Sequence, residues 1–358
     1  MYKKKALIVL PSYATGGAEK VIWSYFKNFK NSKISLKLLV INSKDSNDNF
    51  KNNNIINLNY SRFIYSIPEI LSILKKENIN VIISTFPNIS AIFLLLKYLN
   101  FIKVKIIVRQ PNIIEKSLNG NLKLYILKII YKFFIKFTDA AIVTSEFMKD
   151  EILKYNLKSE KVFLIRNPIS VEETRKNITP VRLSANNLTL IFVGRLVYQK
   201  GIDRVLNLLA INKNIELIVI GEGNYKEDLL KKVKHLSIQN KVRFLGKILK
   251  PYDLVAGADF FILPSRWEGL PNCVLESLAL GTPVLSTKQI YSLIDFKKNI
   301  SNRSIVLFNS ISELSKKINI LKKRKDYRKP KLRKSLLIDY ISPINFNKKI
   351  NKIILKIG

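Results

Sequence analysis

Short hydrophobic runs recur along the whole chain, separated by segments in which hydrophobic residues occur at helical spacing. In the first half these runs are rich in Ile, Val and Leu and are bounded by polar residues, a pattern typical of buried strands. They lie at residues 6–10, 35–41, 80–84, 104–108, 140–144 and 162–165. Because strands that alternate with helices form a parallel sheet, the first half is predicted to be a doubly wound α/β domain.

The alternation lapses between residues 166 and 187, where Asn, Pro, Thr, Ser and charged residues are frequent. A second series of strand-like runs follows at residues 188–193, 216–220, 242–245, 259–263 and 283–286. A chain of 358 residues can bury two cores of ordinary domain size. We therefore predict a first domain at residues 1–170, a hinge at 171–187, a second domain at 188–330 and a basic, partly helical segment at 331–358.

Residues 264–276 of the second domain combine a strand end, a turn, a helix start and two acidic residues. Gly269 ends the strand pattern, and Pro271 fits the first position of a new helix. Glu268 is then expected in the loop at the carboxyl end of the strand, and Glu276 in the first turns of the helix, facing the same crevice. Ligands of open α/β sheets bind at such strand ends. The alternative is that both acids are solvated surface residues.

Two glycine-containing loops are candidate anion sites. The loop after the first strand of the second domain contains Gly194, Arg195 and Lys200. Glycine lets the backbone approach a ligand closely, and the two cations could neutralise a diphosphate. Near the amino terminus, Gly16 and Gly17 precede a helical pattern, and helix N-termini bind anions. The alternatives are a basic loop on a lysine-rich protein and a plain turn.

The spacing of the two acids after a Pro-Ser strand end resembles the nucleotide-sugar signature of retaining glycosyltransferases of family 4. The continuation at residues 277–285, and the Gly-Arg and Lys-Gly elements at 194–201, are similar to the same family. The resemblance is strong over residues 190–286 and weak over the first half. It implies the GT-B fold, an α/β architecture of two Rossmann-like domains facing a central cleft. In that fold the terminal helical segment can pack back on the first domain.

By the same resemblance, Glu276 would hold the ribose hydroxyls of a nucleotide sugar and Glu268 would lie near the transferred sugar. Arg195 and Lys200 would neutralise the charge that develops on the leaving diphosphate. No metal or other cofactor is expected, because GT-B enzymes generally use helix termini and basic groups in its place. The resemblance implies further donor contacts. The backbone at Gly246 and Lys247 would contact the nucleobase, and Gly16 and Gly17 would approach the phosphate. Gly194 and, at the helix start, Leu270 would complete the donor site.

The sequence departs from the family pattern in the first domain. Many relatives carry a histidine there, near the donor sugar, whereas the only histidine of this chain, His235, lies in a helical pattern of the second domain and is expected at the surface. Arg109 and Asn112 occupy the corresponding loop and could offer polar contacts. Residues 287–303 also lack the glycine-rich, acid-containing turn of many relatives. The glycine turn at residues 221–226 lacks the third glycine of a dinucleotide fingerprint, which argues against a nicotinamide or flavin enzyme.

Composition limits the environment and the partners. The chain has 62 Lys and Arg against 26 Asp and Glu, a net charge of +36, so it will bind polyanions. No zinc spacing, RNA-binding signature or recognition-helix motif is present, so no specific nucleic-acid partner is expected. The apolar runs are too short for a membrane span, and no secretory signal is expected. The single cysteine, Cys273, fits a reducing cytoplasm and is expected to be a packing residue.

Two basic segments bear on membrane binding. Residues 122–137 form a helical pattern of apolar and aromatic residues with lysines near one face. We favour a core helix with a solvated basic side, and the alternative is a helix that lies in a membrane interface. Residues 316–334 contain eleven basic residues and one acid, Asp326. Together the two segments predict peripheral contact with an anionic membrane surface.

We therefore predict a cytoplasmic retaining glycosyltransferase, peripheral at the inner face of the cell membrane. It would move a hexose or N-acetylhexosamine from a nucleotide sugar, expected to be UDP-linked, to a lipid-linked glycan intermediate in surface-polysaccharide biosynthesis. Two alternatives come from other classes. The missing first-domain histidine would fit a non-catalytic partner of another glycosyltransferase, and the charge would fit a polyanion-binding protein.

Overall fold

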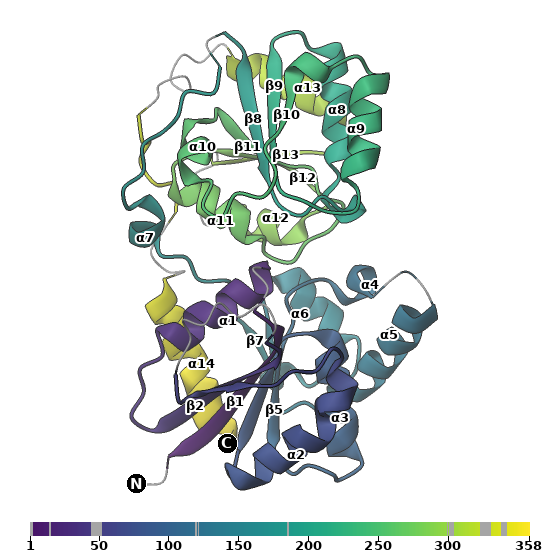
Figure 1. The fold of residues 1–358 in the computed structure, drawn as a ribbon, viewed down its shortest axis with the longest axis vertical. Helices are drawn as coiled ribbons and strands as arrows, with labels where there is room; N and C mark the ends of the chain where they lie inside the picture. Colours follow the sequence, from purple (N-terminus) through teal and green to yellow (C-terminus); the bar gives the residue numbers. More distant parts are fainter. Residues whose placement is uncertain are drawn as a thin grey trace. The chain divides into compact units, whose positions relative to one another are not determined.

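The protein is described by a computed structural model that covers the chain except for residues 1–2, 14–15, 44–51, 119, 121, 185, 299, 301–303, 323–330 and 338–341. The chain forms two compact units (Figure 1). One comprises residues 1–168 with 341–358, and the other comprises residues 169–340. Each contains one parallel sheet with helices on both faces, so the prediction of two doubly wound α/β domains is confirmed.

The first unit contains a seven-stranded sheet in the order β3-β2-β1-β4-β5-β6-β7, with all neighbouring strands parallel. Its strands are β1 (Lys4–Ser12), β2 (Ile34–Asn42), β3 (Ile55–Asn57), β4 (Val81–Ser84), β5 (Lys105–Arg109), β6 (Ala140–Val143) and β7 (Val162–Leu164). Its helices are α1 (Gly17–Lys27), α2 (Ile67–Lys76), α3 (Pro87–Tyr98), α4 (Ile114–Ser117), α5 (Leu122–Phe134), α6 (Glu146–Leu153) and α14 (Pro343–Ile357).

Helix α14 belongs to this first core, although it ends the chain. Its apolar face packs with α1 against the sheet, where Phe346 and Ile350 are buried. Ser342 caps the helix by accepting a hydrogen bond from the backbone N–H of Asn345 at 3.3 Å. A buried hydrogen bond of 2.7 Å from the Tyr25 hydroxyl to Asn351 Oδ1 links α14 to α1.

The second unit contains a six-stranded parallel sheet in the order β10-β9-β8-β11-β12-β13. Its strands are β8 (Leu188–Val193), β9 (Ile215–Ile220), β10 (Val242–Phe244), β11 (Phe260–Leu263), β12 (Val284–Thr287) and β13 (Ile305–Phe308). Its helices are α7 (Val171–Arg175), α8 (Ile202–Ile211), α9 (Lys226–His235), α10 (Tyr252–Gly257), α11 (Asn272–Ala279), α12 (Tyr291–Lys297) and α13 (Ile311–Lys322).

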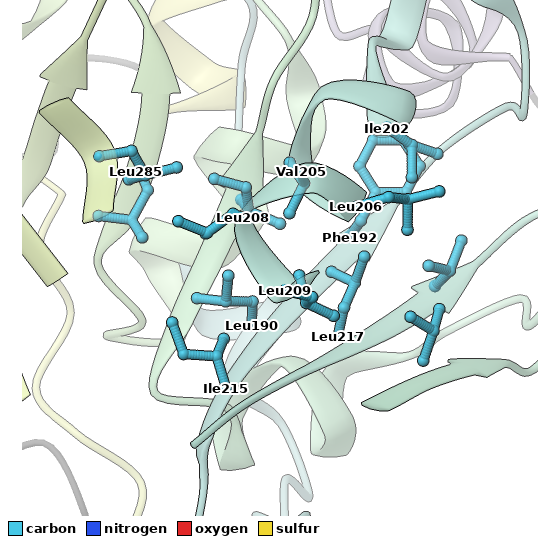
Figure 2. Close-up of a cluster of buried hydrophobic side chains, with 14 of the residues drawn as sticks. Leu190, Phe192, Ile202, Val205, Leu206, Leu208, Leu209, Ile215, Leu217 and Leu285 are labelled. Carbon is cyan, nitrogen blue, oxygen red and sulfur yellow. The ribbon is translucent and has the colours of Figure 1, made fainter. Parts of the chain in front are cut away.

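Helix α8 contributes five buried residues to the second core: Ile202, Val205, Leu206, Leu208 and Leu209. Val205 and Leu209 on α8 meet Leu190 and Leu217 on the sheet, and all four side chains are buried (Figure 2). The apolar residues of α8 recur at helical spacing, whereas β8 and β9 are apolar on both faces because helices cover both sides of this sheet. This packing fixes the loop between β8 and α8, where the candidate cations lie.

The two ends of the predicted segment 331–358 lie in different units. Arg333 Nη2 donates to the Ala256 carbonyl at 2.9 Å, and the Leu336 N–H donates to the Leu278 carbonyl at 2.9 Å, so residues 331–337 belong to the second unit. Helix α14 belongs to the first. The segment predicted as a hinge, residues 171–187, is also part of the second unit, where Arg175 Nη1 donates to the Ala279 carbonyl at 2.7 Å.

Candidate functional site

Three glycines lie at the carboxyl ends of three neighbouring strands, β8, β9 and β10. The Gly194 N–H donates to the Ile220 carbonyl at 3.0 Å, and the Gly221 N–H donates to the Gly246 carbonyl at 2.8 Å. A Cβ added at Gly221, where φ is +143°, would lie 1.8 Å from the Gly194 carbonyl oxygen. The loops after β8 and β9 can therefore approach one another only because position 221 carries no side chain.

Lys200 is brought to the end of β11 by a tight turn. It ends the 3₁₀ turn Tyr198–Lys200, and Gly201 follows with φ +67°. A Cβ at Gly201 would lie 2.2 Å from the Pro264 carbonyl oxygen, so the turn packs directly on the chain leaving β11. Lys200 Nζ and Glu268 Oε1 form an ion pair of 2.5 Å. The structure thus joins two residues that the sequence placed 68 positions apart.

Glu268 is held by further contacts that the sequence did not indicate. Ser265 Oγ donates to Glu268 Oε1 at 2.9 Å, and Gln199 Nε2 lies 3.4 Å from Oε2 and 2.8 Å from the Trp267 carbonyl. The side chains of Lys200 and Glu268 are only 14% and 9% exposed. Burial lowers the pKa of Lys200, but the charge and hydrogen bond of Glu268, together with the nearby Cys273, outweigh this effect, and the net pKa is raised. Lys200 therefore stays protonated at neutral pH, and its pairing stabilises the fold until the pH rises above its raised pKa.

Arg266 makes further contacts that were not predicted from the sequence. Its guanidinium pairs bidentately with Asp203, at 2.9 and 2.7 Å, and lies 3.7 Å above the ring of Tyr198. Its backbone N–H also donates to the Gln199 carbonyl at 2.8 Å. These contacts fasten the loop after β11 to the turn that carries Lys200. No periodicity or motif in the sequence distinguishes Arg266 from the other basic residues.

Glu276 lies half-buried on α11, one helix turn beyond Cys273. Burial and then the charge and hydrogen bond of Glu276 raise the pKa of Tyr252, so that tyrosine is a direct neighbour of Glu276. Helix α11 begins at Asn272 with Pro271 as its N-cap, so the prediction of Pro271 at the first helical position is off by one residue. Gly281 has φ +80° beyond the end of α11, as expected of a helix-ending glycine.

Cys273 lies among the charged residues of the site. Burial raises its pKa to about 12, Lys200 opposes that rise, and Glu268 and Glu276 add to it. All three charged groups therefore lie near the thiol. The high pKa keeps the thiol neutral and unreactive, as a packing residue would be.

In the native protein at mildly alkaline pH, iodoacetamide is expected to modify Cys273 at least about a hundredfold more slowly than in the unfolded chain, because only the thiolate reacts and the raised pKa keeps this thiol protonated. Mass spectrometry of the alkylated protein measures this, with the denatured protein as the control. Rapid modification of the folded protein would show that the thiol is ionised and that its pKa is not raised.

The remaining predicted residues of the second unit line the same strand ends. Arg195 and Lys247 are exposed, directly after Gly194 and Gly246. Leu270 is buried at 3% exposure, and its neighbour Gly269 accepts a hydrogen bond from Ser292 Oγ. The second unit therefore brings Gly194, Arg195, Lys200, Gly246, Lys247, Glu268, Leu270 and Glu276 to the carboxyl edge of one sheet.

Gly16 and Gly17 belong to the first unit. Gly16 is the N-cap of α1 in an extended conformation, and a Cβ there would lie 2.2 Å from Glu19 Oε2. The carboxylate of Glu19 therefore lies at the start of the helix, in the region that an anion would occupy. Of the loop from residue 12 to 17, residues 14 and 15 lie outside the described part of the chain.

A second polar cluster lies at the carboxyl edge of the first sheet. Arg109 is buried, and its Nη2 donates to Asn167 Oδ1 at 2.6 Å, while Nε and Nη1 have no hydrogen-bond partner among the described residues. Thr85 follows β4 beside Arg109, because Ser84 pairs with Val108, and its buried hydroxyl likewise has no partner there. Burial lowers the pKa of Arg109 to about 10, with Glu19 opposing the shift, so the guanidinium stays charged at neutral pH.

Two further expectations can be compared with the structure. Asn112 uses its side-chain oxygen to accept from the Ile113 N–H at 2.9 Å, so it shapes the loop after β5. His235 is exposed in the last turn of α9, which confirms the prediction of a surface residue. Within the described residues, no group of three or more His, Cys, Asp or Glu side chains could hold a metal ion.

Two sequence models of protein families match the chain. One, described as Glycosyltransferase Family 4, matches residues 15–173, and the other, described as Glycosyl transferases group 1, matches residues 173–335. The two models meet close to the boundary between the structural units.

Curated relatives match part of the chain. An uncharacterized glycosyltransferase of Methanocaldococcus jannaschii is 31% identical over 45% of this chain and 43% of its own length. The alpha-monoglucosyldiacylglycerol synthase of Streptococcus pneumoniae is 30% identical over 45% and 40%. A diphospho-undecaprenol 4-alpha-N-acetylgalactosaminyltransferase of Campylobacter jejuni is 30% identical over 39% and 38%. The aligned parts thus span less than half of the relatives' lengths.

Solved structures match the whole chain in fold. HepE of Anabaena, in complex with UDP-glucose, superposes with a TM-score of 0.77 at 15% identity, covering 98% of this chain and 99% of that one. The apo form of WaaB, a lipopolysaccharide outer core galactosyltransferase, superposes with a TM-score of 0.72 at 18% identity, covering 99% of both chains. Because a family model matches each half and both sheets have the Rossmann-like topology of these structures, the chain belongs to the group 1, family 4 glycosyltransferases of the GT-B fold.

Proposed function

We propose that this protein is a retaining glycosyltransferase that takes a hexose or an N-acetylhexosamine from a nucleotide sugar. The observation that carries the proposal is the buried ion pair of Lys200 with Glu268 beside three glycine-lined strand ends, with Glu276 on the adjacent helix. A paired cation, exposed backbone and a carboxylate are the groups that a diphosphate and a ribose diol require. The same cluster argues against a polyanion-binding protein, which would need surface charge but no buried carboxylates.

On the donor side, each residue has a role that follows from its contacts. Lys200 is held in place by Glu268, so its charge faces the leaving diphosphate without reorganisation, and exposed Arg195 adds a second cation. Glu276 accepts hydrogen bonds from the two ribose hydroxyls, and the backbone at Gly246 and Lys247 contacts the nucleobase. We propose that these protein cations serve in place of a metal ion, so EDTA would leave transfer unchanged.

Retention of configuration is proposed from the family match, and the contacts of Glu268 bear only on its route. Its Oε1 already binds Lys200 and Ser265, which disfavours attack of this carboxylate on the sugar to form a covalent intermediate. We therefore infer a front-face displacement. The acceptor hydroxyl oxygen bonds to the anomeric carbon as the bond from that carbon to the diphosphate oxygen breaks, and the departing phosphate takes the hydroxyl proton. Glu268 Oε2 is then available to a hydroxyl of the transferred sugar.

The donor is proposed to be UDP-linked and the acceptor to be a lipid-linked glycan intermediate of surface-polysaccharide assembly. The UDP and UDP-glucose complexes of HepE support the nucleotide, and the diphospho-undecaprenol substrate in the name of the Campylobacter jejuni relative supports the acceptor class. Arg109 and Thr85, with their buried donors, are the candidates for polar contacts on the acceptor side. This chemistry would take place in the cytoplasm at the inner face of the cell membrane.

The donor assignment is tested by a thermal-shift and hydrolysis screen against UDP-, GDP- and ADP-sugars at moderate salt. One sugar nucleotide, expected to be UDP-linked, should stabilise the protein and be hydrolysed slowly. Glu276→Ala is expected to weaken that binding by about tenfold to a hundredfold, since two charge-assisted hydrogen bonds are lost. Glu313→Ala, on the same unit, is the control and should bind normally. A protein that responds to no sugar nucleotide, or an unaffected Glu276→Ala variant, would contradict the donor site.

A further inference from the structure

Helix α5 exposes an apolar face, contrary to the interpretation that we favoured from its sequence. Leu122, Ile126, Ile129 and Phe133 are spaced by four, three and four residues and lie on one side of the helix. Together with Tyr125 they are between 48% and 73% exposed, whereas Tyr131, on the opposite side, is the one buried residue of α5. The helix is therefore not a core helix with a basic outer side, because its outer side is apolar.

The apolar face continues onto the end of α3, which packs beside α5 on the same side of the sheet (Figure 1). The ring of Tyr98 lies 5.4 Å from that of Phe134 and 4.9 Å from that of Phe137. Tyr98 and the next residues Leu99 and Phe101 are at least half exposed. We call this surface the α3–α5 face; it comprises Tyr98, Leu99, Phe101, Leu122, Tyr125, Ile126, Ile129 and Phe133.

The lysines of α5 lie at the margins of this face. Lys128 and Lys132 turn sideways to Glu115, with Lys128 Nζ 3.5 Å from its Oε2. Lys136 Nζ lies over the rings of Phe133 and Phe137, at 4.4 and 5.3 Å. Lys123 is exposed. An apolar centre with aromatic rings and a cationic margin is the pattern of a helix that lies in a membrane interface, with ammonium groups at the level of the headgroups.

We propose that the α3–α5 face is a docking surface that inserts into an anionic lipid bilayer. Charge favours a lipid surface over a second copy of this chain as the partner of the face. A second copy, with net charge +36, would be repelled by the lysines at the margin, whereas anionic headgroups would be attracted to them. No helix among the described residues is long and apolar enough to cross a membrane. The proposal deepens the membrane contact of the proposed function by naming the residues that make it. The basic tract at 316–334 adds no support, since residues 323–330 lie outside the described part.

The test is flotation of the full chain with vesicles of phosphatidylcholine, alone or mixed with phosphatidylglycerol. Ile126→Ser/Ile129→Ser should bind the anionic vesicles at least about tenfold more weakly than the unchanged protein, because two apolar side chains no longer enter the interface. The matched control is Ile211→Ser/Ile320→Ser, which removes two exposed isoleucines of the second unit and should bind like the unchanged protein. No net charge changes in either variant.

Three results would overturn the proposal. Equal flotation of both variants, abolished by salt, would show that scattered surface lysines bind the lipid. If the protein floated with neutral vesicles as strongly as with anionic ones, the lysines at the margin of the face would have no part in binding. A dimer in sedimentation velocity that Ile126→Ser/Ile129→Ser dissolves would identify a second copy as the occupant. Hydrolysis of the sugar nucleotide should be the same in both variants, so a failure of the catalytic proposal would be visible separately from the result with vesicles.

Discussion

Replacement of Lys200 by alanine is expected to lower the rate of sugar transfer by about 10²–10³-fold, the usual cost of removing one preorganised group from a charge that develops in the transition state. Lys200 is suited to that role because the pairing with Glu268 fixes its ammonium group and a raised pKa keeps it charged. The loss should be in kcat more than in KM, since the leaving diphosphate gains charge only as the sugar departs. Release of UDP from the sugar nucleotide measures the effect.

The control for charge is Lys298→Ala, which removes a lysine of the same unit whose side chain is 75% exposed, and it should transfer normally. The control for folding is the double variant Lys200→Ala/Glu268→Ala. Glu268→Ala alone leaves Lys200 buried without a partner and should destabilise the second unit by about 3 kcal/mol, whereas the double variant removes both charges and should recover part of that loss. Normal transfer by Lys200→Ala would refute the donor site.

The fold could be read from the sequence because each strand is a short apolar run between polar residues. Every predicted run is a strand, with ends within two residues of the prediction, and β8 matches at both ends. The two strands that were missed, β3 and β13, are short and lie at the edges of their sheets. Edge position alone does not explain these omissions, because the three-residue edge strands β7 and β10 were predicted and β13 is the wholly apolar run Ile305–Phe308.

The candidate site was predicted as a set of residues but not as a set of contacts. The motifs pointed to Lys200 and Glu268 separately, and their direct pairing depends on the turn at Gly201, which packs on the chain after β11. Ser265 belongs to the Pro-Ser element of the signature, but its contact with Glu268 was not predicted, and Gln199 and Tyr252 were not singled out at all. Such contacts are set by the tertiary fold and leave no periodic signal in the sequence.

The face of α5 was misjudged for a related reason. Lysines at spacings of four and five residues indicated a basic outer side. In the structure, Lys128 and Lys132 form ion pairs with Glu115 on α4 and therefore lie at the margin of the exposed side. Whether an apolar stripe faces a core or solvent depends on what the rest of the chain supplies to cover it, and periodicity is identical in both cases. Here α3 packs beside α5, and Tyr131 donates to Gln110 Oε1 after β5, whereas the side with Leu122, Ile126 and Ile129 stays exposed.

Replacement of Gly221 by alanine is expected to destabilise the second unit by about 2–5 kcal/mol. The new Cβ would lie 1.8 Å from the Gly194 carbonyl oxygen, which is backbone and cannot rotate away, and φ is +143°. The cost combines backbone strain with displacement of a packed loop. Gly246→Ala is the matched control: φ there is +68°, and the nearest atom, Glu222 Oε1 at 3.2 Å, belongs to a flexible side chain, so about 1 kcal/mol is expected.

The stability of the second unit can be measured by tryptophan fluorescence, because each unit contains one of the two tryptophans of the chain. Trp23 lies in the first unit and Trp267 in the second. In a Trp23→Phe background, the fluorescence of Trp267 reports urea unfolding of the second unit alone, which avoids treating two domains as one transition. Equal stability of Gly221→Ala and Gly246→Ala would show that the loops after β8 and β9 do not meet as closely as described. The loop of Gly194 and Arg195 would then be free to move, and the preorganised donor site inferred from it would lose its physical basis.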